Sequence, residues 1–140
     1  MAFVGALYGP SGARLRLAHT PAPAPTWVQP GRRWAIVTAW NPDAQLASAQ
    51  DNRAAQAAFE AQLRAGHWRL TPSMNGSGAW QEPSALIWDA PLAQARRWGE
   101  GLRQAAVLWG VGDRAALVWT APGSAATAPE WFWAVSAAEG

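Results

Sequence analysis

Runs of apolar residues divide the chain into short elements. From Trp34 to Trp40 nearly every position is β-branched, aromatic or small and apolar, and Asn41-Pro42 ends the run. This composition predicts a strand that is covered on both faces and lies centrally in a sheet. Shorter apolar runs predict further strands at residues 3–8, 13–18, 67–71, 84–88, 105–109, 115–119 and 131–133.

Two segments instead repeat their apolar residues at helical spacing. Ser48 and Asp51 resemble a capping box that opens the first, and Phe59 and Leu63 continue its apolar stripe to a natural stop at Gly66. The second helix should begin at Pro91, with an inner face formed by Leu92, Ala95, Trp98 and Leu102.

Segments rich in glycine and proline separate these elements. Residues 9–12 would form the turn between the first two strands, and residues 110–113 would close a second hairpin. Residues 21–25 alternate proline and alanine, which predicts a stiff polyproline-like spacer. We expect a turn or flexible loop over 72–78 and a linker over 122–129.

The order of the elements favours an α+β fold with a ferredoxin-like βαββαβ core. Right-handed crossovers would place both helices on one face of a mostly antiparallel sheet. An extra C-terminal hairpin strand and an N-terminal hairpin would extend that sheet. We expect a single domain over 1–140, with an N-terminal extension over 1–30, a core over 34–119, and a linker and C-terminal tail over 120–140.

Composition narrows the class of protein without identifying a reaction. Half of the residues are apolar and 14% are charged, which is typical of a folded domain. The absence of cysteine excludes disulfides, thiolate nucleophiles and zinc–thiolate sites. The sequence shows no secretory signal pattern and no apolar run of about 18 residues, so we expect a cytoplasmic protein without a membrane partner.

The charged and aromatic residues do not predict a strongly basic surface. All 11 cations are arginine, which keeps the isoelectric point near 10.4 although the net charge is only +2. The attraction for phosphate at neutral pH should therefore be weak. The 11 tryptophans are spread along the chain, which favours packing in the core over one aromatic site.

Several short motifs carry a resemblance to a known family; they are Thr38–Pro42, Asn52, Trp80–Ser84, Ala95 and Gln104–Trp109. Between Trp34 and Trp119 the chain resembles a bacterial family catalogued as domain of unknown function 3293. The resemblance implies a small cytosolic bacterial protein, and it implies no established activity.

Five side chains form the main candidate site: Asn41, Asn52, Trp80, Glu82 and Gln104. Asn41 follows the central strand, and Asn52 lies two turns before Phe59 on the apolar face of the helix, so its amide should face the sheet. Amides, a carboxylate and an indole together would suit a polar planar ligand or a peptide group. The alternative is structural, with Asn41 capping a turn and Asn52 satisfying the backbone of the loop.

Three functions follow from these residues. A non-enzymatic binding or regulatory domain, with a small polar ligand or a protein partner, is the leading hypothesis because no catalytic set is recognisable. Single-stranded nucleic-acid binding is less favoured, and a hydrolase or transferase would use Glu82 as a general base desolvated beside Trp80. The nucleic-acid alternative would use a basic surface interleaved with aromatic rings, formed by Arg32, Arg33, Trp68 and Arg69.

The sequence predicts neither a cofactor nor a metal site. His19 and His67 lack partners at ligand spacing. The glycine-containing turns lack the Lys-Ser/Thr of a phosphate-binding loop, and Gly110 and Gly112 lie in a hairpin instead of opening a helix.

Overall fold

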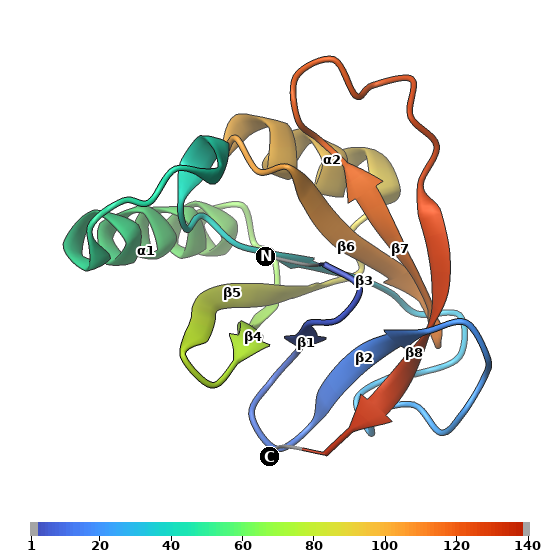
Figure 1. The fold of residues 1–140 in the computed structure, drawn as a ribbon. Helices are drawn as coiled ribbons and strands as arrows, with labels where there is room; N and C mark the ends of the chain where they lie inside the picture. Colours follow the sequence, from blue (N-terminus) through green and yellow to red (C-terminus); the bar gives the residue numbers. More distant parts are fainter. Residues whose placement is uncertain (1–2, 139–140) are drawn as a thin grey trace.

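A computed structural model describes residues 3–138 (Figure 1). One sheet contains all eight strands in the order β1-β2-β8-β7-β6-β3-β5-β4, and every neighbouring pair is antiparallel. The helical elements are η1 (Pro42–Ala44), α1 (Ala49–Ala65) and α2 (Leu92–Gly101). The strands are β1 (Leu7–Tyr8), β2 (Arg14–Ala18), β3 (Arg33–Val37), β4 (Leu70–Ser77), β5 (Trp80–Trp88), β6 (Ala106–Val111), β7 (Arg114–Trp119) and β8 (Glu130–Ala137).

The sheet curls until its two edges nearly meet, which gives a barrel-like shape (Figure 1). At the seam, the Met74 backbone N–H donates to the Gly9 carbonyl at 3.2 Å. The buried Arg14 guanidinium donates to the carbonyls of Leu7, Met74 and Gly76 at 3.0, 2.8 and 2.7 Å. One cation therefore ties β1 and β2 to β4.

The predicted ferredoxin-like fold class is wrong. The predicted core strands are present, but their sheet does not remain open and instead curls into a nearly closed barrel. Strand β8 pairs with both β7 and β2, so the N-terminal hairpin continues the sheet and brings its far edge round to β4. Curling gives the sheet an enclosed inner face, and the helices pack on the outside (Figure 1).

Alternation along the strands produces two apolar cores. Trp34, Ile36 and Leu86 point into the barrel, whereas Val37 and Ile87 pack beneath the helices. Helix α1 contributes Phe59 and Leu63 to the outer core, and α2 contributes Ala95.

The local predictions differ from the structure mainly in their limits. The first helix is confirmed, with the Ser48 hydroxyl accepting from the Asp51 backbone N–H at 3.0 Å. Both hairpins are confirmed as the pairs β1–β2 and β6–β7. The loop predicted over 72–78 is wrong, because β4 extends to Ser77 and pairs with the start of β5. Neither helix within residues 3–138 is long and apolar enough to cross a membrane.

Candidate functional site

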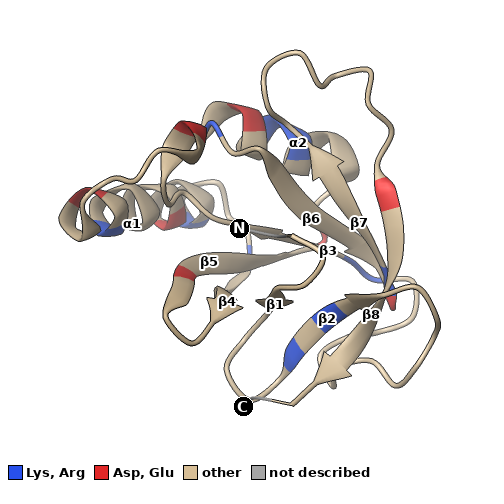
Figure 2. Cartoon of the chain, in the orientation of Figure 1, with Lys and Arg blue, Asp and Glu red and all other residues tan. Residues whose placement is uncertain are grey.

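One end of the barrel interior is polar. Along β5 the inward positions change from the apolar Leu86 to Ser84 and then Glu82, the acidic segment of β5 in Figure 2. On the neighbouring β4, Ser73 and Asn75 lie opposite Ser84 and Glu82. The barrel mouth beside the start of α1 is therefore lined by groups able to form hydrogen bonds.

A pocket of about 470 Å³ opens at this mouth. Its walls come from the loop after β3, the first turn of α1, the β4–β5 turn and the residues before β6. The volume lies within the range of small-molecule sites. All five residues of the main sequence prediction line the pocket: Asn41, Asn52, Trp80, Glu82 and Gln104.

Two of these residues, Asn41 and Asn52, form hydrogen bonds with each other. The Asn52 Oδ1 atom accepts from the Asn41 backbone N–H at 2.8 Å, and its Nδ2 donates to Asn41 Oδ1 at 2.8 Å. Asn52 is 3% exposed and also donates to the Ala47 carbonyl at 3.4 Å. The Ala47 backbone N–H in turn donates to Asn41 Oδ1 at 3.0 Å. Asn52 thus acts through Asn41 and shapes the loop that forms one pocket wall.

The loop that carries Asn41 has an unusual backbone. Asn41, Asp43 and Ala44 have φ angles of 49°, 59° and 57°, in the left-handed region that side chains other than asparagine and aspartate seldom adopt. The Asp43 backbone N–H donates to the Arg103 carbonyl at 2.8 Å, and their side chains form an ion pair at 3.2 Å. Such backbone strain often accompanies a functional site.

Glu82 is the charged group of the pocket. The Asn41 Nδ2 donates to Glu82 Oε1 at 3.2 Å, which fixes one side of the carboxylate. Partial burial raises the pKa of Glu82 above its ordinary value, although the Asn41 hydrogen bond acts in the opposite direction. Burial, together with the charge of Glu82, also raises the pKa of Tyr8, so that its hydroxyl stays neutral.

The remaining two predicted residues differ in their roles. Gln104 is buried, and its Nε2 donates to the Trp40 backbone carbonyl at 3.0 Å. The Gln104 backbone carbonyl accepts from the Thr120 hydroxyl. Trp80 is 73% exposed at the pocket rim, and Leu46 nearby in the lining is 85% exposed. Gln104 therefore anchors the wall, whereas Trp80 and Leu46 present apolar surface at the pocket rim.

The residues of the nucleic-acid alternative lie at the opposite end of β3. Arg32 pairs with Asp89 at 3.2 Å and its guanidinium lies 4.1 Å from the Trp88 ring. The Trp68 ring packs edge-on against Trp98 at 5.0 Å. Arg33 and Arg69 are exposed, but the adjacent indoles are engaged in packing. The structure does not bring these residues together as an open stacking platform.

Sequence reasoning missed the inner part of the site, which includes Tyr8, Thr38 and Asn75. A signal for Asn75 was present, because Ser73, Asn75 and Ser77 alternate within the segment that was expected to be a loop. The glycines in that segment concealed a strand whose polar face points inward.

A comparison with models of protein families matches residues 37–107 to the family described as protein of unknown function (DUF3293). The matched span covers half of the chain and includes all five residues of the candidate site. The family resemblance predicted from the sequence is confirmed. A search of the curated proteins and a search of the solved structures gave no match.

Proposed function

This chain belongs to the DUF3293 family of proteins of unknown function, and we propose that it is a non-enzymatic binding domain for a small polar ligand. The ligand would enter the pocket at the barrel mouth. The observation that carries this proposal is the combination, in one concave site, of a half-buried carboxylate at Glu82 and two exposed apolar side chains.

The apolar rim supplies affinity for a flat part of the ligand. Trp80 is 73% exposed, although large aromatic side chains in proteins are usually well buried. Covering about 100 Å² of apolar surface would contribute roughly 2.5 kcal/mol before the entropy of association is subtracted. A ring stacked on Trp80 would achieve this.

Polar groups in the same pocket supply orientation. Glu82 offers an acceptor whose position Asn41 fixes at 3.2 Å. The pocket thus favours a ligand that carries a hydrogen-bond donor for this carboxylate beside its apolar part.

A hydrolase or transferase that uses Glu82 is the second candidate, and the raised pKa of this carboxyl favours it. General base catalysis needs a further group to stabilise or protonate the reacting atoms. Among the described residues that line the pocket, Glu82 is the single ionisable side chain. Binding without chemistry therefore agrees better with the composition of the site.

A fragment library screened by ligand-observed NMR tests the proposal. We expect aromatic fragments with polar substituents to bind the wild-type chain, and Trp80→Ala to weaken them at least fivefold. Trp131→Ala is the matched control, because Trp131 is another exposed tryptophan, at 45%, and does not line the pocket. Absence of binding by any fragment, or equal loss in both variants, would overturn the assignment.

A further inference from the structure

A smaller cavity lies deeper in the barrel mouth, next to Glu82. Its volume is about 30 Å³. A single water molecule needs about 10–15 Å³ of such free space, so the cavity has room for about two atoms. Phe3, Glu82 and Gln104 line both this cavity and the outer pocket, so the two spaces adjoin. A ligand in the outer pocket can therefore place a short substituent in this cavity.

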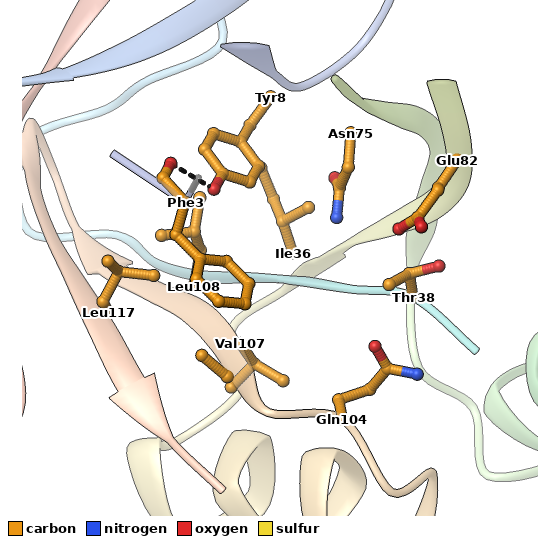
Figure 3. A pocket seen from close by; sticks show the side chains of 11 residues that line it. Phe3, Tyr8, Ile36, Thr38, Asn75, Glu82, Gln104, Val107, Leu108 and Leu117 are labelled. Carbon is orange, nitrogen blue, oxygen red and sulfur yellow. Dashed lines mark hydrogen bonds between the residues drawn. The ribbon is translucent and has the colours of Figure 1, made fainter. Parts of the chain in front are cut away.

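One wall of this cavity carries a hydrogen-bond donor that the described chain leaves unused. Asn75 is 7% exposed and lines the cavity, and Figure 3 shows its side-chain nitrogen turned into that space. The Nδ2 group donates no hydrogen bond to any residue between 3 and 138. Buried polar groups in native proteins almost always have a partner, so this donor points to a bound acceptor.

The opposite side of the cavity offers an acceptor. The Gln104 Nε2 donates to the backbone carbonyls of Trp40 and Leu102 at 3.0 and 3.4 Å. These bonds hold the nitrogen away from the cavity and leave Oε1 directed toward Asn75 (Figure 3). Within the described part of the chain Oε1 accepts no hydrogen bond, and the two amides form none with each other. A group between them would therefore accept from Asn75 and donate to Gln104.

The other polar side chains of the cavity restrict the choice further. The Thr38 hydroxyl donates to the Pro83 carbonyl at 2.8 Å, and the Tyr8 hydroxyl donates to the Phe3 carbonyl at 2.5 Å. Neither hydroxyl has a second proton to offer a ligand. Glu82 adds an acceptor that carries a negative charge, which disfavours an anionic group. The cavity therefore suits a small, neutral group that both accepts and donates.

We propose that the cavity binds the hydroxymethyl group of a neutral alcohol, such as a polyol or a sugar, between Asn75 Nδ2 and Gln104 Oε1. The inference rests on the proposed function and assigns the deep end of the same pocket. A hydroxymethyl group has two heavy atoms, which match the volume, and its oxygen both accepts and donates. An ammonium has no acceptor for Asn75 Nδ2, and a carboxylate has no donor for Gln104 Oε1.

The experiment compares three probes of the same size, benzyl alcohol, ethylbenzene and benzylammonium, by ligand-observed NMR titration at neutral pH. We expect benzyl alcohol to bind at least tenfold more tightly than ethylbenzene, because the methyl group leaves both amides without a partner, and more tightly than benzylammonium. Asn75→Leu keeps the approximate shape of the side chain and should reduce the preference for the alcohol over ethylbenzene to less than threefold. Ser77→Ala, an exposed change on the same strand that lines neither space, is the control and should leave every affinity unchanged.

The outcomes separate this inference from the proposed function. Equal affinity for benzyl alcohol and ethylbenzene, tighter binding of benzylammonium, or a preference for the alcohol that survives Asn75→Leu overturns the hydroxyl assignment. Failure of all three probes to bind, while fragments still bind in a manner that depends on Trp80, does the same and leaves the pocket intact. Failure of every probe and every fragment removes both. The comparison of the probes on the wild-type chain decides the matter even if Asn75→Leu does not fold.

Discussion

Replacing Asn52 with alanine perturbs the site at its base. The side chain makes two hydrogen bonds of 2.8 Å with Asn41 and a weaker one of 3.4 Å with the Ala47 carbonyl. Its removal frees the loop after β3, and with it the donor that Asn41 provides to Glu82. We therefore expect Asn52→Ala to affect both the stability of the fold and the ionisation of Glu82.

The magnitude follows from the contacts. Each lost hydrogen bond contributes about 1 kcal/mol net, and the buried groups left without partners add to the loss. Alanine is the better helix former by roughly 0.6 kcal/mol, which offsets part of it. The free energy of unfolding should fall by about 2–3 kcal/mol. Without the Asn41 hydrogen bond, which lowers the pKa of Glu82, that pKa should rise further.

Urea unfolding followed by tryptophan fluorescence measures the free energy of unfolding, and carboxyl ¹³C NMR titration measures the pKa of Glu82. Gln50→Ala is the matched control, because Gln50 is an exposed amide in the same helical turn and its removal should change stability by less than about 0.5 kcal/mol. If Asn52→Ala is as stable as Gln50→Ala and leaves the pKa of Glu82 unchanged, Asn52 does not organise the pocket and the reasoning fails.

Three further changes test other parts of the account. Glu82→Gln should unfold at a higher urea concentration than wild type at neutral pH, because the raised pKa of Glu82 makes the wild-type fold less stable as the pH rises from about 4.3 through that pKa. The advantage of the variant should vanish below this pH window, and an advantage that is constant with pH would contradict the pKa shift. Gly110→Ala should lower the free energy of unfolding by about 2–4 kcal/mol, since its Cβ would lie 2.2 Å from the buried indole of Trp34, whereas Gly101→Ala faces open space and should not destabilise the fold. Equal urea midpoints for the two variants would count against this packing. Arg14→Met should lower the free energy of unfolding by about 3 kcal/mol or more and speed amide hydrogen exchange along β4, whereas Arg16→Met, an exposed change on the same strand, should have little effect. Similar exchange rates in both variants would show that the seam does not depend on Arg14.

Local sequence patterns predicted most of the elements but not the shape of the sheet. The capping residue Ser48 and the stripe through Phe59 and Leu63 identified α1 because both signals are local. Closure of the barrel depends on β8 pairing with β2 and on Arg14 reaching β4, which are contacts between distant parts of the chain. No periodicity in either segment encodes them, so an open sheet was the simpler expectation.

The outer part of the site was predictable and the inner part was not. Asn41 and Asn52 stand at an element boundary and on an apolar helix face, where a polar side chain is conspicuous in the sequence. Asn75 and Tyr8 face the cavity only because the sheet curls and brings β1 near β4. Residues that meet through closure of a barrel cannot be paired from an open-sheet prediction.

Crystallographic soaking with a fragment library tests the central claim most directly, since it locates each bound fragment. We expect electron density for fragments at the barrel mouth, with a ring against Trp80 and a polar group within hydrogen-bond distance of Glu82. Fragments found at other surfaces while this pocket holds solvent alone would contradict it.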